Sequence, residues 1–204
     1  MKILVLGASG RTGRQIIEQA LENNHEVIAF IRNTKKLDIK HKKLSIIEGD
    51  VRKIRDVEKA IKKATVIISA IGGKLGRKPV CEEGISNIIY QMKKYGKKRI
   101  IAVSTFGTGK TKRRGFYAWL LWTIITKLMR DKEKMEERLQ KSGLNWTILM
   151  PTKLTNSKKT EEYKSGENLM PKGIPKISRA DVAHFALKII KSKKTIHRKI
   201  VLTY

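Results

Sequence analysis

Short apolar runs alternate with amphipathic segments along most of the chain. The runs at 2–6, 26–31, 44–48, 65–71, 99–104, 146–150 and 199–202 predict strands. Apolar residues at helical spacing predict helices over 11–23, 52–63, 82–95 and 116–140, the last of these as one long helix or two. Near-continuous apolar strands separated by helices are typical of a parallel sheet covered on both faces. We therefore predict an α/β fold with a Rossmann-like, doubly wound parallel sheet.

The pattern weakens after the sixth predicted strand. Residues 152–172 are polar and predict a loop with short strands, which would fold over the cleft. Ser178 is expected to start the last helix, with Asp181 three residues on in the position of a capping box. The chain has 204 residues, and neither repeats nor a long linker divide it. We expect residues 1–204 to form a single domain in which 151–177 is a small C-terminal region covering the substrate.

A glycine-punctuated turn joins the first strand to the first helix. Gly7, Gly10 and Gly13 are spaced by three, which permits a tight turn, close approach of a pyrophosphate and close packing of the helix. Such a turn is also an ordinary structural solution, but its place between a strand and a helix favours a dinucleotide site. The cofactor-binding residues expected here are Gly7, Ser9, Gly10, Arg11, Thr12 and Gly13.

The ends of the second and third strands indicate which dinucleotide is bound. Arg32 and Asn33 stand where NAD-binding folds place an acidic residue, and a 2′-phosphate requires positive charge there. Arg32 can alternatively belong to a lysine-rich surface, but its placement favours NADP(H). Asp50, beside Val51, can accept from the adenine amino group or cap a helix over 52–63, and both roles can hold.

The remaining strand ends are expected to face the nicotinamide half, because ligands gather at the carboxyl ends of parallel strands. Ser104 and Thr105 can bond a substrate or can simply be turn residues. The apolar segment after the fifth strand can line a flat pocket or pack on the sheet. The other residues assigned to the cofactor at these ends are Ala70, Ile71, Gly72 and Pro151, and those assigned to the substrate are Phe106, Trp119, Trp122 and Lys153.

The net charge of +28 has two interpretations. It can serve a polyanionic partner, or it can reflect solvated positions filled by lysine. Lysines spread along the whole chain favour the second interpretation, with nonspecific nucleic-acid affinity as a by-product. The longest apolar run, 116–125, is too short to cross a bilayer, and Cys81 is the single cysteine. We expect a cytoplasmic monomer without a metal site.

Several motifs resemble those of atypical short-chain dehydrogenases/reductases of the NAD(P)H-binding, NmrA-like type, within them the biliverdin reductase B/flavin reductase group. The resemblance covers nearly the whole chain and rests on GASGRTG at 7–13, FIRNTKKL at 30–37, GDV at 49–51, EGISNII at 83–89, SGLNWTILMPTKLTN at 142–156 and ISRADVAHF at 177–185. It implies a reductase or a redox-sensing regulator.

Two departures from the family pattern concern catalysis. The Tyr–Lys pair of dehydrogenases, four residues apart, has its counterpart only in Tyr90 and Lys94, which precede the fifth strand and are interpreted as a coincidence. The group's serine and histidine correspond to Thr105, with Ser104 just before it, and to Lys153, so the hydroxyl is present and the imidazole is not.

The resemblance therefore implies an NADPH-dependent reductase of flavins and/or biliverdin-like linear tetrapyrroles. Ser104, Thr105 and Lys153 are its expected catalytic residues. The nicotinamide supplies the hydride in such a reaction, while the protein orients the reactants and excludes water. The alternative is a sensor that binds NADP(H) without turnover.

Overall fold

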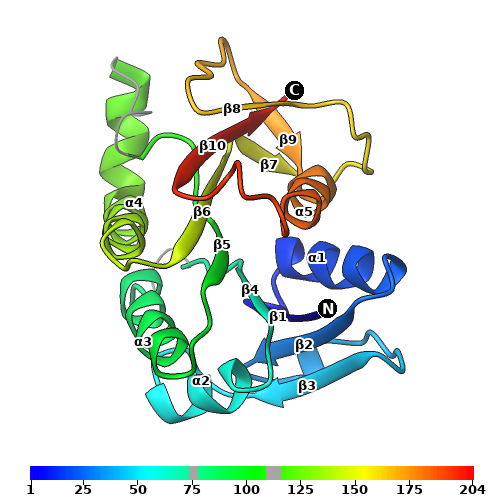
Figure 1. The fold of residues 1–204 in the computed structure, drawn as a ribbon. Coiled ribbons are helices and arrows are strands. Elements are labelled where there is room, and N and C mark those ends of the chain that lie inside the picture. Colours follow the sequence, from blue (N-terminus) through cyan, green and yellow to red (C-terminus); the bar gives the residue numbers. More distant parts are fainter. Residues whose placement is uncertain (74–77, 109–115) are drawn as a thin grey trace.

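The computed structural model describes the backbone of residues 1–73, 78–108 and 116–204, and their side chains apart from 116–125. Strands and helices alternate along the chain (Figure 1). Their order is β1 (Lys2–Leu6), α1 (Arg11–Glu22), β2 (Glu26–Ile31), the 3-10 helix η1 (Thr34–Lys36), β3 (Leu44–Glu48), α2 (Ile54–Ile61), β4 (Val66–Ser69), α3 (Cys81–Lys94), β5 (Arg99–Val103), α4 (Phe116–Gln140), β6 (Asn145–Pro151), β7 (Lys153–Thr155), β8 (Lys164–Gly166), β9 (Lys176–Ser178), α5 (Arg179–Lys188) and β10 (Arg198–Thr203).

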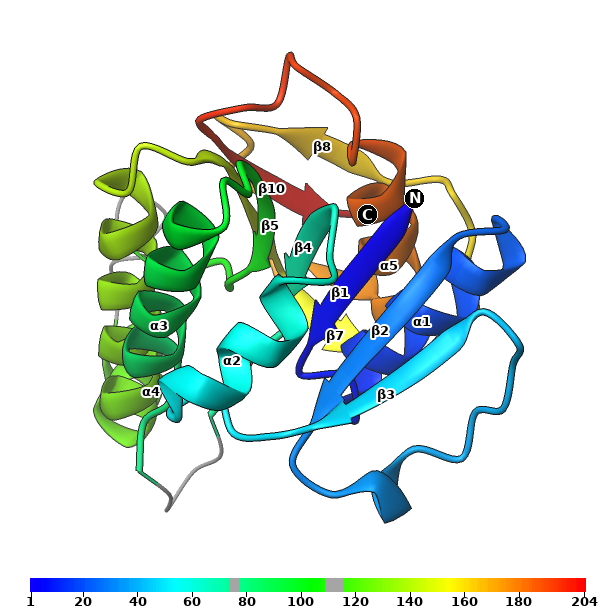
Figure 2. The ribbon, with the colours of Figure 1, turned by 60° about the horizontal axis from the view of Figure 1, so that its bottom comes forward.

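In the described part of the chain, an eight-stranded sheet has the order β3-β2-β1-β4-β5-β6-β10-β8 (Figure 2). The pairs from β3 through β10 are parallel, and β8 adds to β10 in the antiparallel direction. The order reverses beside β1, so β1 and β4 flank the switch point where ligands of such folds bind. The predicted Rossmann-like α/β fold is confirmed.

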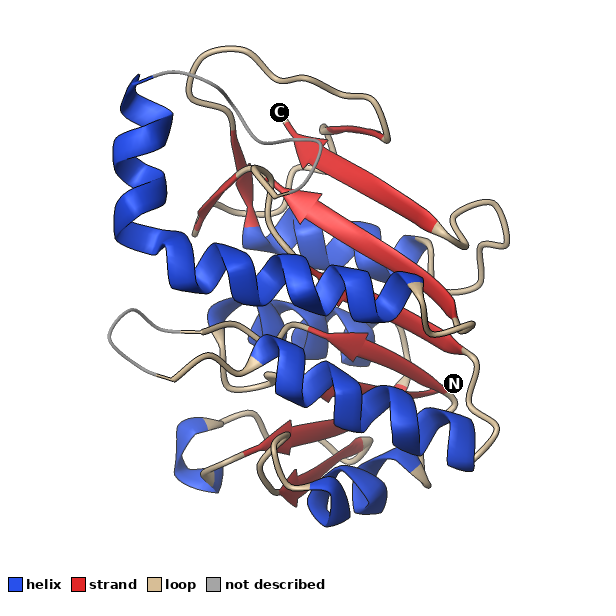
Figure 3. Ribbon diagram, turned by 90° about the vertical axis from the view of Figure 1, so that its left-hand side faces the viewer, coloured by secondary structure: helices blue, strands red, loops and turns tan. Residues whose placement is uncertain are grey.

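Both faces of the sheet are buried, as the apolar strands predict. Ile3 and Val5 pack in the core beneath α1 and α5, whereas Leu4 and Leu6 point into the core beneath α2, α3 and α4. Figure 1 shows these two layers on opposite sides of the sheet, and Figure 3 shows helices of the second layer in front of the strands. This arrangement leaves the carboxyl edge of the strands for the site.

Element boundaries differ from the predictions by one or two residues at most ends. The segment 116–140 is assigned as one helix, α4, which decides between the two forms left open by the sequence. The stretch 152–172, expected as a loop with short strands, contains β7 and β8, and β7 pairs in parallel with β9. Among the described residues, the structure contains no helix with the length and apolarity to span a bilayer.

Helix α3 begins against a carboxylate from α4. The Asp131 side chain accepts from the backbone N–H groups of Val80, Cys81 and Glu82 at 2.8 to 3.1 Å. Burial raises the pKa of Asp131, but these N–H groups outweigh it and hold that pKa below its ordinary value. Because a carboxylate is favourable at a helix N-terminus, Asp131 fixes α3 and α4 to one another.

Asp181 is fully buried and connects three distant segments. One of its oxygens accepts from the backbone N–H groups of Thr160 and Glu161, at 2.9 and 2.8 Å. The other accepts from the hydroxyls of Ser178 and Tyr204, at 2.8 and 2.6 Å. Ser178 caps α5 as expected, by accepting from the Asp181 N–H. In a capping box the side chain at position 181 would also accept from the Ser178 N–H. Here the Ser178 N–H donates to the Tyr204 hydroxyl, so that second bond is absent.

We expect Asp181→Ala to lower the free energy of unfolding by about 3 kcal/mol, because buried donors lose their acceptor. Burial raises the pKa of Asp181, but hydrogen bonds led by that of Tyr204 bring it below the ordinary value. The stability that this group contributes is therefore present above pH ~4 and is lost as the pH falls further. Urea unfolding at several pH values, with the exposed Glu162→Ala as control, measures both effects. Equal stability of the two variants at pH 7 would contradict the prediction.

Candidate functional site: a dinucleotide cleft

The glycine turn after β1 has the geometry of a phosphate-binding cradle. Gly7 has a positive φ of 75°, and a Cβ there would lie 2.5 Å from the Ala70 carbonyl oxygen. A Cβ on Gly13 would lie 2.3 Å from the Gly7 carbonyl oxygen, so α1 packs against the turn only because no side chain intervenes. These two glycines set the shape of the turn.

Gly10 does not set the shape of the turn in this way, because the protein leaves space beside it. A Cβ there would meet only the Gly7 carbonyl oxygen, at 3.1 Å, and its φ of −77° suits any residue. Gly10 is the N-cap of α1 and no side chain caps this helix, so N–H groups of its first turn are open to an anion. The turn therefore fits a diphosphate, with Ser9, Arg11 and Thr12 bordering it.

The ends of β2 and β3 place Arg32 and Asp50 near one another. Arg32 is exposed, and its charge is one of the influences that lower the pKa of Asp50. Asn33 uses its side chain locally, accepting from the Lys35 N–H at 2.9 Å. This corner carries the positive charge that the sequence assigns to a 2′-phosphate, and Arg32 and Asn33 stay predicted contacts of the cofactor.

The predicted capping role of Asp50 is wrong. Helix α2 begins at Ile54 with Lys53 as its N-cap, two residues later than the sequence indicated. The Asp50 carboxylate accepts from the Arg52 backbone N–H at 3.0 Å, in the turn before the helix, and also from the Arg52 side chain, whose hydrogen bond is the main cause that lowers the pKa of Asp50 to about 2. The neighbouring Val51 is buried, and its carbonyl accepts from the Asn87 side chain at 2.9 Å. A contact of either residue with adenine stays a prediction.

A lysine from α4 reaches the carboxyl ends of the two central strands. The Lys132 ammonium donates to the carbonyls of Ile71, after β4, and Val103, at the end of β5, at 2.7 Å each. Ala70 and Gly72 flank the first of these carbonyls, where the sequence predicts the cofactor. Lys132 thus adds a positive charge at the predicted nicotinamide end.

One turn further along α4, Glu136 is buried below the same edge, with 1% exposure. It accepts hydrogen bonds from the hydroxyls of Ser104 and Thr108, the latter at 2.7 Å, and from the Lys199 ammonium at 2.8 Å. The Ser104 hydroxyl is therefore engaged by α4. Glu136 links the turn after β5 to β10.

The other residues predicted at this end lie in two places. Thr105 is partly buried, and its hydroxyl donates to the Phe106 carbonyl at 3.3 Å. The Phe106 N–H donates to the Pro151 carbonyl at 2.8 Å, which brings the ends of β5 and β6 together. Lys153 is exposed on β7, with its backbone N–H bonded to Pro175. Trp119 and Trp122 belong to α4, and their side chains lie outside the described residues.

The pair Tyr90 and Lys94 lies away from this edge. Both belong to the last turns of α3, which starts beside the end of β4 and runs back along the sheet. Tyr90 is exposed, and Lys94 pairs with Glu58 of α2 at 2.9 Å. This placement agrees with the interpretation of their spacing as a coincidence.

Sequence reasoning missed Lys132 and Glu136. Their i,i+4 spacing places them on one face of a helix, and the only available signal was this spacing within a strongly charged segment. Such a segment is usually a solvated surface, so the pattern alone did not indicate a buried site.

A sheet with this strand order and a glycine turn at its switch point defines a dinucleotide-binding protein of the Rossmann type. A family model described as NAD(P)H-binding matches residues 7–193, and the chain belongs to this family. The predicted nicotinamide cofactor is confirmed at this level as NAD(P)H. The uncharacterized protein YwnB of Bacillus subtilis is 27% identical over 193 residues, covering 90% of this chain and 89% of that protein.

Solved structures share the fold over almost the whole chain. ChuY of Escherichia coli O157:H7, described as an anaerobillin reductase, has a TM-score of 0.82 at 24% identity and covers 99% of this chain and 96% of its own. A short-chain dehydrogenase/reductase of Veillonella parvula in complex with NADP has a TM-score of 0.82 at 19% identity, covering 100% and 94%. These likenesses establish the common architecture.

Substitutions at Gly10 and Gly13 are expected to have different effects, the first on cofactor binding and the second on stability. Gly10→Val is expected to fold and to weaken binding of NADPH and NADH alike by at least about tenfold, because its side chain fills the space of the diphosphate. Gly13→Ala is expected to lose about 2 kcal/mol of stability, because its Cβ meets backbone. Thermal unfolding and calorimetric titration distinguish the two. Unimpaired cofactor binding by Gly10→Val would contradict the assignment.

Proposed function

We propose that this protein is an NADPH-dependent reductase of flat conjugated acceptors, flavins and/or biliverdin-like linear tetrapyrroles. The observation that carries the proposal is the set of α4 side chains at the predicted nicotinamide end, two of them charged and one apolar. This helix contributes Lys132 and the buried Glu136, and the residue one turn before Lys132 is Leu128. If Lys132 corresponds to the lysine of the Tyr–Lys dehydrogenases, their four-residue spacing would put a phenol at position 128, where this chain has an apolar side chain.

The position of Leu128 restricts the chemistry. A Cβ built on Gly73 would lie 2.5 Å from a methyl carbon of Leu128, so this side chain fills the space beside Gly73, in the loop that follows β4. A ketone or alcohol reaction through a tyrosinate is disfavoured by such a site. Reduction of a flavin or of a tetrapyrrole methine needs no enzyme phenol, because the proton can come from solvent or from a substrate pyrrole.

The residues at the edge then have roles in binding and orientation. NADPH supplies the hydride when it is bound, and each turnover consumes one NADPH and one proton per acceptor reduced by two electrons. Lys132 would hold the nicotinamide half by its charge, while Glu136 fixes Ser104 and the turn carrying Thr105 and Phe106. Lys153 would attract an acidic substituent of the acceptor. The region 151–177, with Trp119 and Trp122 of α4, would cover the acceptor.

Two further observations support a reductase. The chain belongs to a family described as NAD(P)H-binding, and ChuY, which shares its fold, is described as an anaerobillin reductase. The alternative, an NmrA-like sensor without turnover, is favoured by the same Leu128, since a site that lacks a phenol can also be inactive.

The experiment that tests the function follows NADPH absorbance with FMN, biliverdin IXβ and biliverdin IXα as separate acceptors. We expect acceptor-dependent decay of NADPH with at least one of them, abolished in Gly10→Val. Binding of NADPH without decay for any acceptor would overturn the reductase and favour the sensor.

Arg32→Asp is expected to lower the preference for NADPH over NADH by at least about tenfold, because a carboxylate would repel the 2′-phosphate. Lys98→Asp makes a similar charge change at an exposed residue just before β5, at the amino ends of the strands and away from the site. The ratio of Kd values for the two cofactors, measured for both variants, isolates the local effect. An unchanged ratio in Arg32→Asp would show that Arg32 does not contact the 2′-phosphate.

A further inference from the structure

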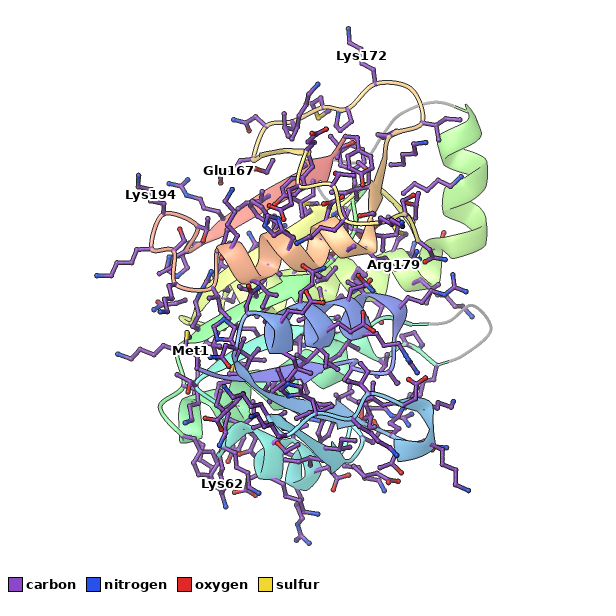
Figure 4. All side chains as sticks on the ribbon, turned by 90° about the vertical axis from the view of Figure 1, so that its right-hand side faces the viewer. Met1, Lys62, Glu167, Lys172, Arg179 and Lys194 are labelled. Atoms are coloured by element: carbon purple, nitrogen blue, oxygen red, sulfur yellow. The ribbon has the colours of Figure 1, made fainter. Side chains whose placement is uncertain are left out.

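A groove of about 610 Å³ opens beside the glycine turn, between α1, the segment 156–159 and the start of α5. Figure 4 shows Arg179 at the start of α5, next to α1. Basic and amide side chains form much of the lining, namely Arg11, Arg14, Asn156, Lys158, Lys159 and Arg179. The groove therefore begins where the phosphate-binding helix begins.

Two guanidinium groups, those of Arg11 and Arg179, line this end of the groove. The Arg179 guanidinium donates to the Asn156 side-chain oxygen at 2.7 Å and to the Leu154 carbonyl at 3.3 Å. Both acceptors are neutral. Within the described part of the chain, neither Arg11 nor Arg179 forms an ion pair with a carboxylate. Burial and then the nearby charge of Arg11 lower the pKa of Arg179. Arg179 thus keeps its positive charge without a carboxylate partner inside a concave surface.

Apart from Lys158, the other charged residues of the groove have partners or lie further along it. Arg14 pairs with Asp38 at 2.5 Å and Lys159 with Glu161 at 2.9 Å. The groove's own acids, Glu18 and Glu22, lie two and three turns along α1 from Arg11, toward its C-terminal end. The groove is therefore positive near the glycine turn and acidic at its far end.

The hydrogen bonds of Arg179 connect this charge to the segment that follows β6. Leu154 and Asn156 belong to the segment that directly follows β6, and β6 ends at Pro151. An acceptor held at the carboxyl ends of β5 and β6 would have its edge near this segment. Guanidinium groups bind carboxylate and phosphate through paired N–H donors, which a lysine does not offer.

We propose that Arg179, with Lys158, forms a recognition site for the acidic substituent of the acceptor, a phosphate or a carboxylate, next to Arg11, which borders the cofactor diphosphate. This inference rests on the proposed function and adds to it the substrate class: planar acceptors that carry an anionic side chain. Asn156 acts as a positioning residue by holding the Arg179 guanidinium.

Matched ligands test the site. FMN and riboflavin share the isoalloxazine ring and differ in the phosphate, while biliverdin and its dimethyl ester differ in the carboxylates. Binding of each is measured by fluorescence or absorbance titration in saturating NADP⁺, so no turnover is needed. We expect wild-type protein to prefer the anionic member of at least one pair by about tenfold. The preferred pair identifies phosphate or carboxylate as the group bound.

Variants then assign the preference to residues. Arg179→Gln should abolish most of the preference without changing affinity for the neutral ligand, and Arg179→Lys should restore part of it. Lys158→Gln should act in the same direction, and Lys172→Gln, on the loop between β8 and β9 (Figure 4), should have no effect. Unfolding curves verify that each variant is folded. If Arg179→Gln does not fold, the wild-type ratios of affinity for the anionic and neutral ligands, together with the ratios for Lys158→Gln, still test the recognition site.

Equal wild-type affinity for both members of each pair would overturn the recognition site. So would a loss of NADP⁺ affinity in Arg179→Gln with an unchanged ligand ratio, because Arg179 would then serve the cofactor. A clear preference for anionic ligands together with no NADPH oxidation would overturn the reductase and leave the anion site standing.

Discussion

The contact of α1 with the glycine turn is the constraint on which the site depends. No side chain fits between Gly13 and the carbonyl of Gly7, so the helix approaches the first strand more closely than any other residue at 13 would allow. That approach directs the open N–H groups of α1 at the space above the switch point of the sheet. It also sets the position of the α1 surface on which α5 packs, and with it the groove between them.

The sequence predicted what is encoded locally. Strand and helix positions follow from apolar spacing, and the turn at Gly7 to Gly13 follows from glycines three residues apart, so both were identified without long-range information. The site at the nicotinamide end was predicted only in part. Ser104 was placed at a strand end, but its partner Glu136 comes from a helix thirty-two residues later in the chain. In the sequence, the charged segment around Glu136 looks like a solvated helix surface. Only the packing of α4 against the sheet shows that Glu136 is buried.

The wrong prediction for Asp50 and the omission of Arg179 also come from interactions that the local sequence pattern does not reveal. An aspartate before a helix is a good N-cap by pattern, and the Asp50 carboxylate does accept from the Arg52 N–H, yet this bond closes a turn and α2 begins only at Ile54. Arg179 follows a capping serine and is one of many basic residues in the sequence. Its significance arises from Arg11, more than 160 positions away, and from a concavity that only the tertiary structure creates.

The packing of α1 against α5 also has a consequence for biosynthesis. Gln19 of α1 donates to the carbonyl of Ala180, 161 residues later, and the apolar residues of α1 share one core with those of α5. During translation the surface of α1 that packs on α5 stays exposed until the segment containing α5 has left the ribosome. Contacts of such large sequence separation slow folding and prolong the exposure of apolar surface. The long interval between the synthesis of α1 and that of α5 therefore favours aggregation of the nascent chain through this surface.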